Sequence, residues 1–425
     1  MLSREIVDTY TEILKEELIP AMGCTEPIAV AYAGALARET LGAQPQTVEL
    51  VVSGNIIKNV KSVIVPHTNG RKGLQTAVAA GICFGKAEKV LEVISEANDS
   101  QLSDMDTFLQ EAEIIVRESS ARCPFDIQVT VRSEKNSAYV RIIGHHTNVV
   151  CVRRGKEYLV DKPVSEERVP VPENRGLLNV RDIVTFANEV NLDLVRGILE
   201  EQIRCNMAIA EAGMHGHYGA DIGKILIRSY GNSVQNRAKA YAAAGSDARM
   251  NGCELPVVIN SGSGNQGMTA SIPVIVYAKE CNVSQDMLLR ALVVSNLVTI
   301  HLKTGIGSLS AYCGATSAGA GAGAGICYLY GGGYDEISHT IVNALAINSG
   351  MLCDGAKASC AAKIASAVEA GLLGMQMYMH DSQFYYGDGL VARNVEETIQ
   401  AVSTIAREGM RETDSEIIHF MVENT

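Results

Sequence analysis

The sequence predicts an α+β protein, in which a mostly helical domain is interrupted by a smaller α/β domain that contains an antiparallel sheet. Strand-like alternation of apolar and polar residues is concentrated between about residues 45 and 165, and it nearly vanishes after about residue 180. Helical periodicity dominates on both sides of this block. We therefore expect an N-terminal helical segment at 1–44, an inserted domain at 45–165 and the rest of the helical domain at 166–425.

The first forty residues have a helical pattern with one interruption. Apolar residues recur near a helical period in two runs, Ile6, Tyr10 and Leu14 and then Ile28, Val30 and Leu36. The segment Gly-Cys-Thr-Glu-Pro at 23–27 lies between these runs and contains residues that end or kink a helix. We expect the first helix to pack back onto the C-terminal helices.

The middle block combines strands and helices. Residues 47–52 alternate like a strand, and β-rich runs separated by polar turns follow at 125–132, 137–143, 149–153 and 158–160. Between the first strand and the later ones, residues 73–84 and 104–116 have a helical pattern. These features predict an α/β unit with an antiparallel meander.

The remainder of the chain is a succession of helix-like segments. They run over 180–212, 220–247, 268–282, 284–303, 306–330, 334–350, 354–373 and 393–409. The glycine- and alanine-rich stretch 316–325 could be low-complexity sequence, but disordered segments are rarely so free of charge. We expect a buried helix there, whose small residues let neighbouring backbones approach.

The composition is that of an acidic globular protein. The 425 residues include 36 Lys and Arg against 48 Asp and Glu, and the net charge of −12 argues against nucleic acid or anionic membranes as partners. We see no signal peptide and expect no membrane-spanning stretch, so the protein should be soluble and cytoplasmic with its eleven cysteines reduced. Five cysteines among apolar or small residues should be buried: Cys83, Cys151, Cys205, Cys253 and Cys327.

Three late cysteines, Cys313, Cys353 and Cys360, form the most informative motif. Three thiolates are one fewer than a closed zinc site needs, but they can hold a [4Fe–4S] cluster by three corners and leave one iron for a substrate. Zinc is the competing interpretation, but Cys353 and Cys360 are farther apart than the usual spacing of about two to four residues.

Other motifs that suggest catalysis or metal binding are weaker. His145-His146 and His215-Gly-His217 resemble metal pairs, but 212–220 is a glycine-rich loop without acidic support. A nucleophile elbow and a phosphate-binding Walker loop are both absent from the sequence. No lysine lies in a convincing context for a pyridoxal phosphate Schiff base, which argues against the standard alternative cofactor for amino-acid elimination.

The segment 262–267 fits the pattern G-x-G-x-x-G after a strand-like run at 255–260. A dinucleotide fold would need a second strand ending in an acidic residue, whereas the region that follows is helical. A glycine-rich turn that opens a helix can instead bind the carboxylate of a small substrate, with Ser261, Ser263 and Asn265 as donors. A plain tight turn is the alternative.

The interruption at 23–27 is the second candidate for chemistry. Cys24 is flanked by glycine and followed by Glu26 and a proline, which suggests a shaped, partly exposed turn. Helix N-terminal amides or a nearby metal could tune such a thiol toward the thiolate. The alternative is a helix kink that contains a buried cysteine.

Taken as an ordered set, four motifs resemble the L-cysteine desulfidase family, which is related to the α chain of iron–sulfur L-serine dehydratases. They are Gly-Cys-Thr-Glu-Pro at 23–27, Ser-Gly-Asn-Ile-Ile-Lys-Asn at 53–59, Ser-Gly-Ser-Gly-Asn-Gln-Gly at 261–267 and the late cysteines. The resemblance covers nearly the whole chain. One departure is His67, which stands where relatives have a glycine.

The resemblance implies an iron–sulfur lyase that converts L-cysteine to pyruvate, ammonia and sulfide. It implies Cys313, Cys353 and Cys360 as cluster ligands, Cys24 as general base and Glu26 as the group that positions it or relays the proton. The implied substrate-binding residues are Asn55, Lys58, Ser261, Ser263, Asn265 and Lys303, although a lysine such as Lys303 is more often solvated.

Several alternatives stay open at the level of the sequence. The protein could be an L-serine dehydratase, or a non-catalytic iron–sulfur or thiol sensor, although no output module is evident. Cys281 could lie near the cluster, but we expect it in the core of its helix. A homodimer is one option for the oligomeric state.

Overall fold

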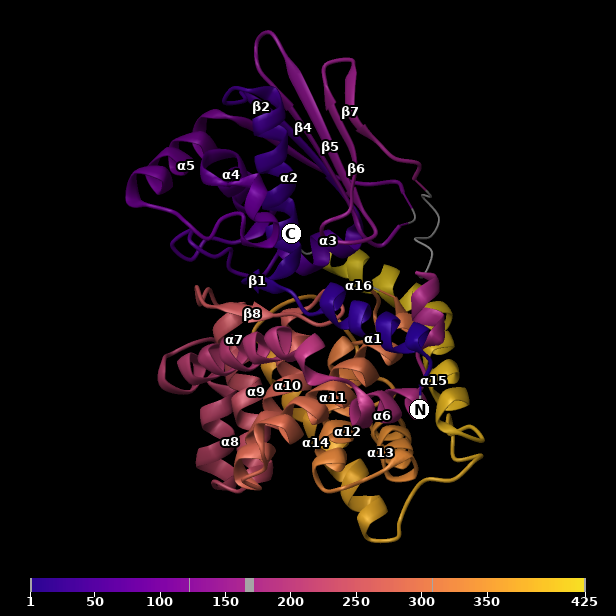
Figure 1. Cartoon of the computed structure of the whole chain (residues 1–425). Coiled ribbons are helices and arrows are strands. Elements are labelled where there is room, and N and C mark those ends of the chain that lie inside the picture. The colour runs from indigo at the N-terminus through magenta and orange to yellow at the C-terminus, as the bar shows by residue number, and fades with distance from the viewer. Residues whose placement is uncertain (1, 122, 165–171, 308, 424–425) are drawn as a thin grey trace.

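A computed structural model describes residues 2–121, 123–164, 172–307 and 309–423. The predicted α+β class is confirmed, because one part of the chain forms a six-stranded sheet covered by helices and the other is an assembly of helices (Figure 1). The first helix, α1 (Arg4–Glu17), lies with the helical part although the chain next enters the sheet part (Figure 1). It packs against α11 (Gln285–Ile306), as the sequence suggested.

The sheet has the strand order β3-β2-β4-β5-β6-β7. The bounds are β2 Thr47–Val52, β3 Glu113–Glu118, β4 Asp126–Arg132, β5 Ser137–Ile143, β6 Val149–Arg154 and β7 Glu157–Asp161. Strands β2 and β3 are parallel, and β4 to β7 form the predicted antiparallel meander. Helix α2 (Thr25–Leu41) covers β4, β5 and β6, and it packs in turn against α4 (Gly73–Phe84).

Two features of the sheet part differ from the prediction. The segment 104–116 is predicted as one helix, but α5 spans Asp99–Glu111 and the residues after it enter β3. Ile114, Ile115 and Val116 are β-branched and pair in register with β2, and this pairing outweighs the helical periodicity. A short helix that periodicity did not indicate, α3 (Gly54–Val60), follows β2 directly.

The helical part contains eleven further α-helices within the described residues. They are α6 Val180–Glu189, α7 Arg196–His215, α8 Ile222–Tyr230, α9 Val234–Met250, α10 Gly264–Glu280, α11 Gln285–Ile306, α12 Gly314–Leu329, α13 Tyr334–Ile347, α14 Cys360–Met379, α15 Val395–Thr404 and α16 Arg411–Glu423. The short turns are η1 Ala87–Glu92, η2 Glu173–Leu177, η3 Leu192–Leu194 and η4 Ile405–Gly409.

Three of the predicted helices are divided or extended. The segment 180–212 is broken at Asn191, whose side chain caps the turn η3, and 220–247 is broken at Gly231, where a φ of 83° ends α8. The segment 393–409 ends as the π-helical turn η4 and leads into α16, which was not predicted.

The glycine- and alanine-rich stretch is a buried helix, as predicted, and forms most of α12. A Cβ at Gly319 would lie 2.2 Å from the carbonyl oxygen of Ala367, and one at Gly323 would lie 2.6 Å from that of Gly371. Both contacts join residues 48 positions apart, so α12 and α14 run parallel with their backbones touching. The residues that precede these two helices therefore lie at the same end of the pair.

The two parts of the molecule are joined near the N-terminal turn. Strand β1 (Pro20–Met22) pairs antiparallel with β8 (Pro256–Val258) in a separate two-stranded sheet. The hydroxyl of Thr25 donates to the carbonyl of Gly262 at 2.9 Å. These contacts bring the turn at 23–26 against the glycine-rich turn at 261–265.

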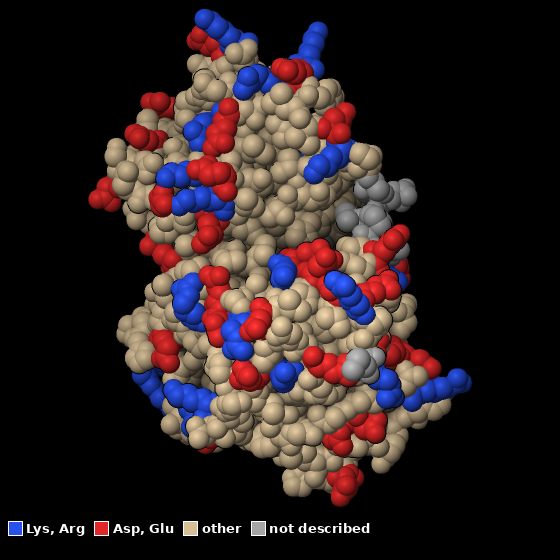
Figure 2. All heavy atoms as spheres, viewed as in Figure 1, with Lys and Arg blue, Asp and Glu red and all other residues tan. Residues whose placement is uncertain are grey.

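The sequence predicts that no stretch is long enough to span a bilayer, and α11 shows that this prediction is wrong. This helix is long and apolar enough, but 78% of its most apolar 18 residues are buried inside the protein, as in a core helix. On the face shown in Figure 2, Lys and Arg side chains are interspersed with Asp and Glu and form no broad basic patch among the residues drawn.

Candidate active site

One cavity of about 100 Å³ lies where the N-terminal turn meets the starts of α10, α12 and α14. A single water molecule needs about 10–15 Å³, so the cavity can admit a small ligand. Nine of the residues singled out from the sequence line it: Cys24, Glu26, Ser261, Ser263, Asn265, Lys303, Cys313, Cys353 and Cys360. Segments far apart in the chain thus converge on one site.

The three late cysteines form one wall of this cavity. Cys313 directly precedes α12, Cys360 is the first residue of α14, and Cys353 lies on the loop between α13 and α14. The parallel packing of α12 and α14 brings Cys313 and Cys360 to the same end of the helix pair. The predicted helices 306–330 and 354–373 begin later than expected, because the residues before them form these cysteine loops.

The loops that carry Cys313 and Cys353 are hydrogen-bonded to one another. The N–H of Cys313 donates to the carbonyl of Met351 at 3.0 Å, and the N–H of Cys353 donates to that of Ala311 at 2.6 Å. The two bonds lie on either side of a single antiparallel β-bridge. The spacing between these two thiols is therefore set by backbone geometry and not by side-chain packing alone.

The three thiols differ in their acidity. The Cys313 thiol donates to Cys353, and this bond, aided by the ammonium groups of Lys58 and Lys303, lowers the pKa of Cys353 to about 6 despite burial. The same pairing, together with burial, raises the pKa of Cys313. Burial also raises the pKa of Cys360. The wall therefore presents one readily formed thiolate and two further sulfur donors.

The three thiols suit an iron–sulfur cluster better than a single metal ion. Within the described residues, no three His, Cys, Asp or Glu are placed to hold one metal ion, as the ligands of a structural zinc are. The three thiols instead border an open cavity, and soft sulfur ligands beside free space suit an iron–sulfur cluster. The residues able to hold such a group are Cys313, Cys353 and Cys360.

A buried arginine faces the same cavity. Arg249 of α9 is 2% exposed, and its Nε donates to the carbonyl of Gly23 at 2.8 Å while Nη1 donates to Oδ1 of Asn265 at 3.2 Å. Its Nη2 is buried and has no hydrogen-bond partner in the part of the chain that the structure describes. An unpartnered buried donor costs about 1–3 kcal/mol, so this group is well suited to receive an anionic ligand.

The start of α10 lies beside this arginine. Ser261 and Gly262 have positive φ values of 51° and 77°, and α10 then begins at Gly264 with no side-chain cap on its first N–H groups. Uncapped N–H groups at a helix start attract an anion. A Cβ at Gly264 would lie 2.4 Å from the Nε of Arg249, so glycine is needed for this approach.

Lys303 supplies a second buried cation. Its side chain is 5% exposed, near the C-terminal end of α11, and is not solvated as a lysine at a helix end usually is. Burial lowers the pKa of Lys303 to about 8, against the opposing influence of Cys353 and Cys313. The cavity therefore combines sulfur donors with the buried cationic side chains of Arg249 and Lys303.

Cys24 differs from the partly exposed, thiolate-forming residue that the sequence suggested. It is 2% exposed, and its Sγ donates to Oε2 of Glu26 at 3.2 Å. Burial, reinforced by the carboxylate of Glu26, raises the pKa of Cys24 well above its usual range. Cys24 is therefore a protonated thiol in this environment.

Glu26 is ionised and has a histidine nearby. Burial alone would raise the pKa of Glu26, but His146, Cys24 and Arg249 together lower it to about 2. The Nε2 of His146 is 3.9 Å from Oε1 of Glu26, which is an ion-pair distance for a protonated imidazole but too long for a hydrogen bond. His146 follows β5, so the sheet part contributes directly to the cavity.

Comparison with known proteins identifies the family. The model of the serine dehydratase alpha chain matches residues 85–419. The chain belongs to the serine dehydratase alpha chain family. A UPF0597 protein of Desulfitobacterium hafniense (strain Y51) is 55% identical over 414 residues, which cover 97% of this chain and 96% of the relative. A UPF0597 protein of Finegoldia magna is 48% identical, and the match covers 97% of this chain and 99% of the relative. A UPF0597 protein of Treponema denticola is 42% identical, and the match covers 98% of each.

In this member of the serine dehydratase alpha chain family, His146 and Arg249 are the main residues of the cavity that sequence reasoning missed, and Gln266 and Lys363 are others. His146 was considered only as half of a metal pair, and the Phe125 ring packs against it edge-on. Arg249 carries no local signal, because an arginine in a helix is ordinarily solvated. Its burial follows from contacts with the turns at 23 and 265, which a single sequence does not reveal.

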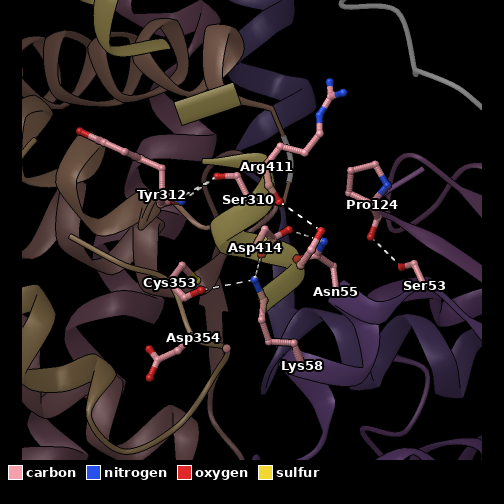
Figure 3. Close-up of polar contacts among 12 residues, drawn as sticks. Ser53, Asn55, Lys58, Pro124, Ser310, Tyr312, Cys353, Asp354, Arg411 and Asp414 are labelled. Atoms are coloured by element: carbon pink, nitrogen blue, oxygen red, sulfur yellow. Dashed lines mark hydrogen bonds and ion pairs between the residues drawn. The ribbon is translucent and has the colours of Figure 1, made fainter. Parts of the chain in front are cut away.

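Two residues proposed for substrate binding lie elsewhere. Asn55 and Lys58 are not among the described residues that line the cavity, and both contact Asp414 of α16 (Figure 3). The backbone of Lys58 does approach the Cys353 loop, since a Cβ at Gly355 would lie 2.3 Å from its carbonyl oxygen. Asn55 and Lys58 therefore lie outside the cavity, and Lys58 packs against the loop that carries Cys353.

The other cysteines and His67 lie outside the cavity. Cys281 is exposed at the end of α10, so the prediction that it lies in the core is wrong. Of the five cysteines expected to be buried, Cys205, Cys253 and Cys327 are buried. The other two, Cys83 and Cys151, are partly exposed. His67 pairs with Glu254, with Nδ1 3.2 Å from Oε1.

The depressed pKa of Glu26 predicts a pH-dependent contribution to stability. A carboxylate with a pKa of about 2 in the folded protein and about 4.3 when unfolded stabilises the fold by about 3 kcal/mol at neutral pH. This contribution is present above about pH 4.3 and is lost as the pH falls toward 2. Glu26→Gln should therefore lower the unfolding free energy of the apoprotein at pH 7, with a gap that narrows toward pH 3.

Urea unfolding between pH 3 and 7 measures this gap directly. The exposed Glu134, in the turn after β4, gives a matched control, because Glu134→Gln removes the same charge at a solvated position. A Glu26→Gln deficit that stays constant across this range would contradict the assignment.

Proposed function

We propose that this protein is an iron–sulfur-dependent lyase that converts L-cysteine to pyruvate, ammonia and sulfide by β-elimination. The main support is the meeting of three cysteine thiols with the buried Arg249 and Lys303 in one cavity. Soft sulfur ligands beside cationic donors suit a small amino acid that carries a carboxylate and a β-sulfur. Membership of the serine dehydratase alpha chain family supports elimination chemistry on such a substrate.

The proposed cofactor is a [4Fe–4S] cluster held by Cys313, Cys353 and Cys360. When bound, it would supply a Lewis-acidic iron without a protein thiolate, able to polarise the substrate. The chain contributes the paired loops that hold Cys313 and Cys353, and the charge of Lys303, which offsets that of the thiolates.

The substrate carboxylate is proposed to bind at the start of α10. The free Nη2 of Arg249 is the main donor, and the uncapped N–H groups of α10 add to it. Ser261 and Ser263 line the same wall, and Asn265 orients the guanidinium through Nη1. This arrangement would place the carboxylate between Arg249 and the cysteine wall.

Removal of the α-proton needs a base, for which we propose Cys24. Because Cys24 is protonated, it must first transfer its proton toward Glu26, to which it is hydrogen-bonded. We propose His146 as the group that takes the proton onward, because its buried Nε2 lies 3.9 Å from Oε1 of Glu26 and has no hydrogen-bond partner among the described residues. The aminoacrylate product then tautomerises and hydrolyses without further catalysis.

The proposed location is the cytoplasm. All eleven cysteines are free of disulfides, and a reducing compartment keeps such thiols available for iron.

L-Serine is the second candidate substrate, because the matching family model is that of the serine dehydratase alpha chain. A thiolate leaves more readily than hydroxide and is a good ligand for iron, so we expect L-cysteine to be preferred. A sensor that binds L-cysteine without turnover is the non-catalytic alternative.

The proposal predicts release of pyruvate and sulfide from L-cysteine by protein reconstituted anaerobically with iron and sulfide, in proportion to its cluster content. Cys353→Ala should lose both the cluster absorbance and turnover. The control Cys281→Ala, at an exposed cysteine outside the cavity, should keep both. L-Serine is assayed in parallel.

Each result of this assay has a definite meaning. A full cluster without turnover of either amino acid would contradict the reaction and favour the sensor. Turnover of L-serine alone would move the assignment to a dehydratase. Failure of the wild-type protein to take up a cluster would contradict the proposed cofactor.

The carboxylate site makes a separate prediction. Arg249→Lys should raise the KM for L-cysteine about 10–100-fold with a smaller change in kcat, because a lysine cannot keep the bonds to Gly23 and Asn265 and also reach the ligand. Arg237→Lys, in the first part of α9 and paired with Glu280, is the matched control. An unchanged KM in correctly folded Arg249→Lys would place the carboxylate elsewhere.

A further inference from the structure

The C-terminal helix α16 lies against α3, at the boundary between the two parts of the molecule (Figure 1). The helices are close, because a Cβ at Gly54 would lie 2.8 Å from the side chain of Ile418. The ammonium group of Lys61 also donates to the carbonyl of Met421 at 2.6 Å. Helix α16 is therefore attached both to α3 and to Lys61, the residue that follows it.

Lys58 connects this pair of helices with the loop that carries Cys353. Its side chain is 1% exposed, and Nζ lies 2.6 Å from Oδ1 of Asp414 and 3.3 Å from the carbonyl oxygen of Cys353. The Nδ2 of Asn55 donates to Oδ2 of the same carboxylate at 2.7 Å. Figure 3 shows Asp414 next to Asn55 and Lys58, with the Lys58 amine directed at the Cys353 peptide.

The position of Lys58 depends on the carboxylate of Asp414. A buried ammonium group without a partner is costly, and removing one member of a buried pair destabilises far more than the pair itself contributes. Without Asp414, Lys58 would have to move toward water or accept the loss of its charge compensation. Movement toward water would withdraw the donor from the Cys353 carbonyl, and an amine that stays in place without its charge would donate a weaker hydrogen bond.

We infer that Asp414 is a positioning residue for the cluster loop: through Lys58, α16 sets the place of the Cys353 peptide. This inference rests on the proposed function in that Cys353 is taken as a cluster ligand. It assigns α16 a role in retaining the cofactor, although α16 contributes no described residue to the cavity.

The loop has a second, independent support. Lys363 of α14 donates to the carbonyl of Leu352 at 2.7 Å and pairs with the carboxylate of Asp354. Loss of Asp414 should therefore make the Cys353 loop more mobile without unfolding it. A graded loss of the cofactor is the expected result.

The test begins with hydrogen exchange of the apoprotein. Asp414→Asn, which keeps the shape but removes the charge, should raise the exchange rates of the Cys313 and Cys353 amides at least tenfold, since both lie in the paired loops. Asp414→Glu should restore slow exchange at least in part. Glu412→Ala, at an exposed acid on the same helix, should leave the exchange rates unchanged.

A double variant separates positioning from simple charge neutralisation. Lys58→Gln with Asp414→Asn removes both charges, so it should fold at least as well as Asp414→Asn alone. Its loop should still exchange faster than in the wild type, because the bond from Lys58 to the Cys353 carbonyl is gone. Exchange at the wild-type rate in the double variant would overturn the inference.

The reconstituted protein gives a second readout. Asp414→Asn should lose its cluster absorbance under a chelator at least tenfold faster than the wild type, and the reduction potential of the remaining cluster should rise because a nearby negative charge is removed. If Asp414→Asn loses its cluster at the wild-type rate and keeps the wild-type reduction potential, the role of α16 is overturned. If the wild type takes up no cluster, the proposed function fails, while the apoprotein exchange still decides the role of Asp414.

Discussion

The backbones of α12 and α14 touch at Gly319 and Gly323, where a Cβ would lie 2.2 and 2.6 Å from carbonyl oxygens of the facing helix. Because the helices run parallel, this contact places their first residues side by side and brings Cys313 near Cys360. The loop that leads into α14 can then pair with the loop that leads into α12, which adds Cys353. A larger residue in the glycine stripe would separate the helices and, with them, the three thiols.

The charges around this wall depend on one another. Lys58 and Lys303 are 1% and 5% exposed, and burial of a cation is unfavourable unless an anion compensates it. Asp414 compensates Lys58, whereas the groups that most favour the charged form of Lys303 are the sulfurs of Cys353 and Cys313. Binding of iron would convert these thiols to thiolates and so stabilise the same lysine. Cofactor binding and lysine burial are thus expected to reinforce each other.

Much of the fold follows from local patterns, and most of the site's chemistry does not. Alternation predicts β2 and the meander, and uncharged small residues predict the buried helix α12. The strand β3 depends on its pairing partner, and the helix breaks at Asn191 and Gly231 depend on single turn residues. Hydrophobic periodicity detects neither. Cysteine count and spacing indicated the three thiols. The burial of Arg249, the approach of His146 to Glu26 and the protonated state of Cys24 arise from contacts between distant segments, which the sequence pattern does not contain.

In the proposed cofactor site, three protein thiolates hold a four-iron cluster and one iron is left for the substrate. Mössbauer spectroscopy of protein reconstituted with iron-57, recorded before and after addition of L-cysteine, tests it most directly. We expect one iron to differ from the other three and to be the one whose Mössbauer parameters change when L-cysteine binds. Four equivalent irons that do not respond to L-cysteine, or a single mononuclear iron, would contradict it.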